Sequence, residues 1–316
     1  MRWNDRIGRR IKLGDLHIFL AVAQSGTMAK AASELAVSHP AVSRAIRDLE
    51  HTLGVQLLER NPRGVTVTAY GRAMIDRSHA AFDELRQGVK DIESLADPTS
   101  GEVRIGTTPP LAASYLSAVI HRLVKRHPRM AFHVIVEDSE KQRRNLSERR
   151  VDLLIFRKAP MFVGGELTFE PLFESPYVVA AGRKSPWLRR RRISLRDLAG
   201  EMWALPSSDN SAFGAFVADV FRASGLPVPR ATVVATALEM RANLLRTGRY
   251  LSIIPEFWLQ FPVRHPFIRK LPVELPIASG PIGIVTLKNR TPSPAARLFM
   301  DCAREMAMPD FVAGRT

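Results

Sequence analysis

The chain has 316 residues, 46% of them hydrophobic, and this length predicts two or three domains with packed cores. The apolar run from His17 to Ala23 is too short to cross a membrane, and the basic start lacks the apolar stretch that follows it in a signal peptide. A single cysteine, Cys302, excludes an internal disulfide and a thiolate zinc site. These features predict a cytoplasmic protein with no membrane partner and no metal.

The net charge of +15 is unevenly distributed along the chain. Residues 1–68 carry ten Lys/Arg against six Asp/Glu, residues 69–97 carry four against six, and residues 98–316 carry 32 against 19. Most of the excess positive charge therefore lies in the last region, so charge alone does not indicate nucleic-acid binding. The basic cluster Arg189–Arg192 in that region is typical of a solvated face, with an anion site or an auxiliary DNA contact as the alternative.

The spacing of apolar residues from Leu13 to Leu53 predicts three consecutive helices. The first is expected over 13–24 and is ended by Ser25-Gly26, because glycine readily adopts the backbone conformation of a helix end. Thr27 is expected to cap the second helix and Ser38 the third. The third helix repeats its apolar residues at a 4-3-4 spacing, and these must face inward: Val42, Ile46, Leu49 and Leu53.

The opposite side of the third helix is polar and basic. Two helices joined by a tight turn, the second presenting such a face, form the helix-turn-helix that enters the major groove of DNA. An ordinary helical hairpin with a solvated face is the alternative. The residues expected over base edges and phosphates are Ser38, His39, Pro40, Ser43, Arg44 and Arg47.

Residues 55–68 predict a β-hairpin directly after the helices. Strands are expected over 56–59 and 65–68, with a turn at 61–64. Arg60 and Arg63 lie at this turn, where they could reach phosphates or the minor groove. A helix-turn-helix followed by such a wing predicts a winged DNA-binding domain over residues 1–68 and disfavours the plain hairpin.

A long helix is expected from Thr68, its cap, to about Ala96, and it forms a linker over 69–97. A helix of this length would leave an apolar stripe in water, so we expect it to form a homodimer interface; a helix lying on its own domain is the alternative. The heptad seam of the stripe consists of Ile75, Ser78, Phe82, Leu85, Val89, Ile92 and Ala96.

Beyond residue 97, short apolar strands alternate with helices, which predicts α/β units on a largely parallel sheet. A two-lobed α/β domain is expected over 98–316, with one lobe at about 102–174 and 280–316 and the other at about 175–279. Ligands of such sheets bind at strand ends, although Ser and Thr there are also ordinary helix caps. The effector-binding candidates are Thr107, Thr108, Ser139, Arg157, Ser207, Ser208 and Thr236.

Several segments of the N-terminal region resemble the signature of LysR-type transcriptional regulators. They are Phe19–Ala23, Ala31–Leu35, Ala41–Ile46, Leu49-Glu50, Leu53–Arg60 and Thr68–Gly71. The resemblance implies a linker-helix dimer, often paired again into a tetramer, and two periplasmic-binding-protein-like lobes with a cleft between them. Two features depart from the family: about ten extra residues precede the first helix, and His39 stands where Gln is frequent.

The expected fold is therefore multidomain, α + α/β: a winged helix-turn-helix, a linker helix and a two-lobed effector domain. The expected function is sequence-specific transcriptional regulation, with double-stranded DNA bearing an inverted repeat as one partner and a small-molecule effector as another. RNA polymerase is a third partner if the protein activates transcription. The effector is either an anion, which Arg157 could pair, or a sugar, because Arg246–Pro255 resembles the galactose-binding-protein-regulator subgroup.

No catalytic or nucleotide-binding motif is found in the sequence, so we expect neither an enzyme nor a cofactor. The rival interpretation is a solute-binding or enzymatic α/β protein with an accessory helical domain. A nonspecific architectural DNA protein is a third possibility, which the large cleft-forming region disfavours.

Overall fold

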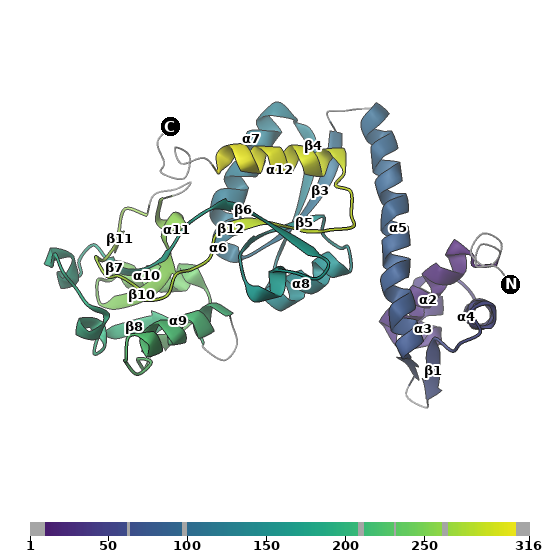
Figure 1. The fold of residues 1–316 in the computed structure, drawn as a ribbon, viewed down its shortest axis with the longest axis horizontal. Helices are drawn as coiled ribbons and strands as arrows, with labels where there is room; N and C mark the ends of the chain where they lie inside the picture. Colours follow the sequence, from purple (N-terminus) through teal and green to yellow (C-terminus); the bar gives the residue numbers. More distant parts are fainter. Residues whose placement is uncertain are drawn as a thin grey trace. The chain divides into compact units, whose positions relative to one another are not determined.

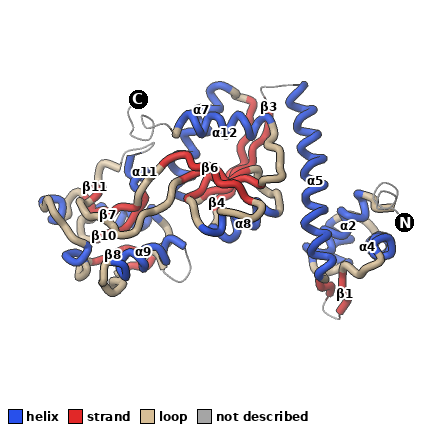
Figure 2. Tube along the Cα trace, viewed as in Figure 1, coloured by secondary structure: helices blue, strands red, loops and turns tan. Residues whose placement is uncertain are grey.

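The computed structural model describes residues 10–61, 64–96, 100–207, 212–230, 232–260 and 265–307 (Figure 1). The chain forms two compact units, one ending at Val89 and the other beginning at Lys90. Figure 2 shows that the first unit is mostly helical and that the second contains most of the strands. No helix in the described ranges combines the length and the apolar character needed to cross a membrane.

The first unit begins with the three helices that the apolar spacing predicts. Thr27 accepts a hydrogen bond from the Lys30 N–H, and Ser38 accepts one from the Ala41 N–H, so both predicted N-caps are confirmed. Gly26 ends the first helix in the left-handed conformation, with φ of 74°. The elements of this unit are α2 (Leu13–Ser25), α3 (Met28–Glu34), α4 (His39–Leu53), β1 (Leu58–Asn61), β2 (Gly64–Val67) and most of α5 (Ala69–Ala96).

The wing forms two residues later than predicted for its first strand. Asn61 pairs with Gly64, so the connection is only two residues long. Gly64 has φ of 137°, and a Cβ there would lie 2.4 Å from the Gly26 carbonyl oxygen. That carbonyl also accepts the Val65 N–H at 2.9 Å. The wing is therefore fixed against the turn between α2 and α3, and only glycine fits at this contact.

The predicted seam of α5 divides into two parts. Ile75 and Phe82 pack against the core of the helix-turn-helix, and Ser78 is buried. Leu85, Val89 and Ile92 are exposed, and the side chain of Ala96 lies outside the described residues. The continuous dimer seam was thus wrong for its first half: the three helices and the wing leave an apolar surface that α5 itself covers.

In the described part of the second unit the strands form two five-stranded sheets. The first has the order β4-β3-β5-β12-β6 and the second the order β11-β7-β10-β8-β9. The strands are β3 (Ser100–Thr107), β4 (Arg129–Val136), β5 (Leu153–Arg157), β6 (Leu167–Phe173), β7 (Tyr177–Gly182), β8 (Met202–Leu205), β9 (Val233–Val234), β10 (Tyr250–Pro255), β11 (Ile268–Lys270) and β12 (Ile282–Leu287). The helices are α6 (Pro109–Leu111), α7 (Ser117–Arg126), α8 (Ser139–Ser147), α9 (Ala212–Ala223), α10 (Leu238–Arg246), α11 (Glu256–Gln260) and α12 (Pro294–Met306), with a π-helical turn, η1 (Ala112–Leu116), between α6 and α7. The described residues of this unit also include the short 3-10 turns η2 (Pro160–Phe162), η3 (Pro186–Arg189) and η4 (Leu195–Leu198).

Each sheet is largely parallel, as predicted, but contains one reversed strand. In the first sheet β12 runs antiparallel to both of its neighbours, and in the second sheet β7 does so. Each of these is the first strand after the chain crosses from one sheet to the other. The sequence pattern does not report this reversal, because a buried antiparallel strand and a buried parallel strand have the same apolar composition.

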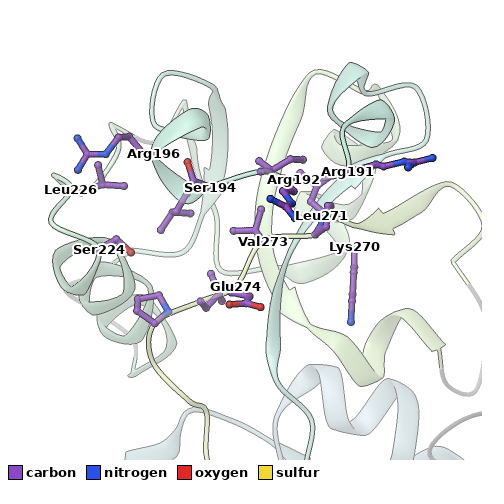
Figure 3. Close-up of a pocket in the computed structure, with 15 residues that line it drawn as sticks. Arg191, Arg192, Ser194, Arg196, Ser224, Leu226, Lys270, Leu271, Val273 and Glu274 are labelled. Atoms are coloured by element: carbon purple, nitrogen blue, oxygen red, sulfur yellow. The ribbon is translucent and has the colours of Figure 1, made fainter.

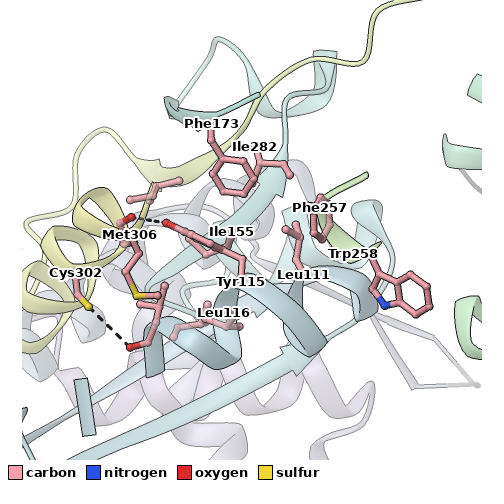
Figure 4. Packing of buried hydrophobic residues seen from close by; sticks show 14 of the residues in the cluster. Leu111, Tyr115, Leu116, Ile155, Phe173, Phe257, Trp258, Ile282, Cys302 and Met306 are labelled. Carbon is pink, nitrogen blue, oxygen red and sulfur yellow. Dashed lines mark hydrogen bonds between the residues drawn. The ribbon is translucent and has the colours of Figure 1, made fainter. Parts of the chain in front are cut away.

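A shared core joins the two sheets. It includes Phe173 at the end of β6, Val178 in β7, and Phe257 and Trp258 in α11. Figure 4 shows Phe257 near Leu111 of α6, and the ring centre of Phe257 lies 6.5 Å from that of Phe173 in β6. Beside this core the chain crosses twice, at residues 174–176 and 271–281, and the Ser279 hydroxyl donates to the Ser175 carbonyl at 3.4 Å. The two lobes are therefore joined by adjacent crossover segments.

Candidate functional site

The first candidate site is the polar face of α4. Val42, Ile46 and Leu49 are buried beneath it, while Leu53 is only partly buried. Five of the six predicted contact residues on this helix and its cap are exposed: Ser38, His39, Pro40, Arg44 and Arg47. They provide two guanidinium groups, an imidazole and a hydroxyl near the N-terminal half of one helix, which are hydrogen-bonding groups suited to base edges and phosphates.

Ser43 differs from its neighbours on α4. It is half-buried, and its hydroxyl donates to the Met28 sulfur at 3.4 Å. Its backbone carbonyl accepts the Arg47 Nε–H at 3.3 Å, which restrains the Arg47 side chain along the helix. Ser43 thus lies at the edge of the polar face, against the start of α3.

The wing lies next to α4 because Glu50 connects them. The Glu50 carboxylate accepts the backbone N–H groups of Leu57 and Leu58 at 2.7 and 3.1 Å. Arg60, in β1, is exposed, whereas Arg63 lies outside the described residues. The sequence analysis did not assign a role to Glu50, although an acidic residue late in a basic recognition helix is a signal that could have drawn attention to it.

The second candidate site is a cleft of about 360 Å³ between the two lobes. Its lining comes from both sheets and from the second crossover, and among the predicted effector residues it includes Thr108, Ser139 and Arg157. The volume is at the small end of the roughly 300–1,000 Å³ typical of ligand pockets.

Arg157 connects the lining of the cleft to the second crossover segment. Its Nη1 donates to the Gly280 carbonyl at 2.7 Å, and its guanidinium carbon lies 4.4 Å from the centre of the Tyr177 ring. Its Nη2 is enclosed by protein and has no acceptor in the described part of the chain. Arg157 also makes a side-chain hydrogen bond with Tyr177, so a cation–π contact, a carbonyl and a hydroxyl surround its positive charge, and none of these partners is a carboxylate.

The hydroxyl candidates separate into two groups. Thr108 and Ser139 line the cleft, and neither caps a helix with its side chain: α8 is capped by Asp138, which accepts from the Lys141 N–H. Thr107 is buried and donates to the Ile155 carbonyl at 2.8 Å, so it stabilises the sheet. Ser207 and the exposed Thr236 are not among the residues that line the cleft, and Ser208 falls outside the described residues.

The opposite wall of the cleft is aromatic, and the sequence analysis missed it. Tyr177 packs against Phe213 and Phe216 of α9, with ring centres 4.6 and 4.8 Å apart. Burial raises the pKa of the Tyr177 hydroxyl. Behind this wall Arg241 is buried, with its guanidinium carbon 5.3 Å from the Phe213 ring. The i, i+3 pair of phenylalanines in α9 was the available signal.

The basic cluster of the second lobe lines a different hollow, of about 930 Å³ (Figure 3). Arg191, Arg192 and Arg196 are exposed at its edge, as predicted for a solvated face. Lys270, which also lines it, is paired with Glu256 at 2.6 Å. Its apolar floor is formed by side chains such as Leu271, and it shares no lining residue with the cleft between the lobes.

A winged helix-turn-helix with an exposed basic recognition helix, followed by a two-lobed α/β unit with a cleft, defines a ligand-responsive DNA-binding regulator. Residues 13–72 match the model described as "Bacterial regulatory helix-turn-helix protein, lysR family", and residues 96–308 match the "LysR substrate binding domain". The chain belongs to the LysR family and is a DNA-binding transcriptional regulator with an effector-binding domain. The predicted family and fold class are confirmed.

Relatives match along nearly the whole chain. The HTH-type transcriptional regulator PcaQ of Agrobacterium fabrum is 29% identical over 313 residues, covering 98% of this chain and 99% of its own. GbpR of Azospirillum brasilense, also named a transcriptional regulator, is 28% identical and covers 93% of this chain and 86% of its own. The structure of full-length CbnR complexed with its target DNA shares the fold, with a TM-score of 0.54 and 23% identity, covering 94% of this chain and 100% of its own.

Proposed function

We propose that this regulator binds an inverted-repeat operator through two copies of the α4 face. The supporting observation is that α4 buries one side in the domain core and leaves His39, Pro40, Arg44 and Arg47 exposed on the other. Arg60 and Arg63 of the wing would contact phosphates, and Ser38 and Ser43 the edges of the recognition surface. Two identical DNA-binding domains related by twofold symmetry require a palindromic DNA site.

The two copies would associate through α5. Leu85, Val89 and Ile92 repeat at a 4-3 spacing and are 52%, 54% and 68% exposed, which is unusual for large apolar side chains on a single helix. A homodimer formed through this stripe would bury them. A second association of the effector domains would give a tetramer, and an activating protein would also contact RNA polymerase.

The effector would bind in the cleft between the lobes and act through the adjacent crossovers. Arg157 contacts the cleft and the second crossover at once, through the Gly280 carbonyl. A ligand that binds one arrangement of the two lobes more tightly increases the fraction of molecules in that arrangement. We propose that the linker helix transmits this change to the two DNA-binding domains and alters how they bind and bend DNA. We propose that the cleft serves regulation in the cytoplasm and carries out no catalysis.

The experiment that tests the DNA-binding proposal is selection of bound genomic fragments by the purified protein, followed by footprinting. A recurrent inverted repeat is expected. Arg44→Ala should lose most of this site-specific binding, whereas Arg196→Ala, which removes the same charge from an exposed position of the effector domain, should retain it. Fragments without a common site, recovered with a folded protein, would contradict the proposal.

A further inference from the structure

Basic side chains gather at the end of the second sheet where β7 stops. β7 lies between β10 and β11: Leu251 of β10 pairs with Ala181, and Ile268 of β11 pairs with Gly182. The segments next to Arg183, the residue after β7, are therefore those at the start of β10 and β11. We call the surface that these segments form the basic edge; it consists of Arg183, Lys184, Arg246, Arg249 and Arg269, around Phe267.

Printed contacts show that the segments of the basic edge lie together. The Arg183 backbone N–H donates to the Phe267 carbonyl at 2.8 Å. The guanidinium carbon of Arg246 lies 4.8 Å from the centre of the Phe267 ring. A Cβ at Gly248, which has φ of 82°, would lie 2.8 Å from the Cβ of Lys184. Three segments distant in the sequence thus form one continuous surface of the second lobe.

The positive charge of the basic edge has no counter-charge in its own segments. Residues 177–192, 240–255 and 265–270 contain no Asp or Glu. All five cations are exposed, and none of them forms an ion pair with a carboxylate of the described residues. Lys270, the neighbour of Arg269, differs because it is paired with Glu256 at 2.6 Å. Unpaired like charges this close together create a positive potential that attracts a polyanion.

The chemistry of the basic edge favours a partner whose own surface is charged. Guanidinium groups bind phosphate oxygens in a planar, two-pronged arrangement. Phe267, which is 51% exposed, offers an apolar surface, but Arg246 stacks over its ring. The centre of a protein–protein interface is depleted of charge, so an acidic protein fits this surface less well. Duplex DNA carries a negative charge about every 1.7 Å along its axis, and this regulator already binds it.

We propose that the basic edge of the second lobe is a second, sequence-independent DNA contact, which binds phosphates outside the stretch held by the DNA-binding domains. It adds to the α4 face a contact that reads no bases. Because both contacts belong to one chain, the second raises affinity through effective concentration. The contact is carried by a lobe, so any change in lobe arrangement would also change the path that the DNA takes.

The test measures binding of the full chain to random-sequence duplexes by fluorescence anisotropy over several salt concentrations. A duplex of about 20 base pairs is filled by a pair of helix-turn-helix domains, whereas one of about 60 base pairs leaves flanking DNA for a second contact. Random sequences make the result independent of whether the operator is an inverted repeat. Failure here and failure of the proposed operator binding are therefore separate outcomes.

The variant that tests the contact is Arg246→Gln with Arg249→Gln. It should weaken binding to the long duplex roughly tenfold at low salt and reduce the slope of log K against log salt by about two units. Binding to the short duplex should change little. The same two positions changed to Lys keep the charge and should bind as the unmodified chain does, which separates an electrostatic role from a structural one.

The matched control is Arg143→Gln with Arg144→Gln, which removes the same charge from exposed positions of α8 in the first lobe. Its binding to both duplexes should stay close to that of the unmodified chain. Equal losses in the two double variants would show an effect of net charge and overturn the proposal. So would an unaltered affinity of Arg246→Gln, Arg249→Gln for the long duplex, or an equal loss on both duplex lengths. Polyglutamate that competes as well as DNA at equal charge would identify an acidic protein as the partner instead.

Discussion

The Glu50 carboxylate accepts the Leu57 backbone N–H at 2.7 Å, and this contact joins the recognition helix to the first strand of the wing. The same oxygen accepts the Leu58 N–H at 3.1 Å. Leu57 lies directly before β1, and Leu58 is the first residue of β1. Glu50 therefore sets the position of the wing relative to the exposed face of α4.

Replacing Glu50 by Ala should weaken operator binding although it removes a negative charge from a DNA-binding domain. It leaves two backbone donors without their acceptor and should lower the free energy of unfolding by about 1–3 kcal/mol. Glu34→Ala, at an exposed position of α3, removes the same charge and should leave affinity unchanged or slightly higher. Fluorescence anisotropy with operator DNA and urea unfolding provide the two measurements, and equal affinities for the two variants would contradict this role.

Ser43→Ala should reduce affinity for the operator more than affinity for random DNA. The half-buried hydroxyl contacts Met28, so we also expect a small loss of stability, below about 1 kcal/mol. The comparison is made by competition with random DNA at one salt concentration. If both affinities fall by the same factor, the hydroxyl serves only to pack α4 against α3.

The arginines of the wing should increase the affinity for DNA without discriminating between DNA sequences. Arg63→Ala should weaken binding to all DNA alike and reduce the slope of log K against log salt by about one unit. Titrations over several salt concentrations measure this slope. A slope that does not change would remove Arg63 from the phosphate contacts.

A buried ion pair in the first lobe should be important for folding. The Arg290 guanidinium lies 2.6 Å from an Asp152 oxygen, and both side chains are about 95% buried, at 5% and 6% exposure. Arg290→Ala leaves the Asp152 carboxylate buried without this partner and should destabilise the protein by about 3–5 kcal/mol. Arg304→Ala breaks a pair with Glu170 whose side chains are 43% and 36% exposed, and should lose less than about 1 kcal/mol. If denaturant unfolding gave similar losses of unfolding free energy for the two variants, burial of the ion pair would not determine its contribution to stability.

The thiol of Cys302 should resist modification in the folded protein. Burial raises its pKa, so the reactive thiolate forms only at a pH above the ordinary range of a cysteine. Because the unfolded thiol ionises first as the pH rises, this group's contribution to stability should decrease above about pH 9. Iodoacetamide labelling against pH, with and without denaturant, tests this, and equal rates in the two states would contradict it.

An acidic residue in the exposed stripe of α5 should prevent self-association. Val89→Asp would bury a carboxylate in the proposed dimer interface and should raise the dimer dissociation constant by more than roughly tenfold. Arg77→Asp, at an exposed polar position of the same helix, is the control. Sedimentation over a range of concentrations gives the constant, and an unaltered Val89→Asp dimer would place the interface elsewhere.

Rules that depend on residues close together in the sequence predicted the helices of the first unit well. Caps at Thr27 and Ser38, the left-handed glycine at position 26 and the buried stripe of α4 follow from contacts within about one helical turn. The seam of α5 was wrong for its first half, because Ile75 and Phe82 pack against residues distant in the chain, and its exposed half stays a prediction. The periodicity identified an apolar stripe without showing what covers it.

The sequence by itself determined the class of this protein, its helix boundaries and the exposed basic face of α4, since these depend on neighbours along one helix. The tertiary structure alone decided the composition of the cleft. Arg157 meets the Gly280 carbonyl across 123 residues of sequence, and Tyr177 meets Phe213 only because β7 and α9 pack together. Thr107 and Thr108 are adjacent, yet Thr107 ends β3 with its hydroxyl donating to a carbonyl of the sheet, whereas Thr108 lies beyond the strand and lines the cleft. Long-range packing selects which side chains converge, and a one-dimensional pattern does not contain that information.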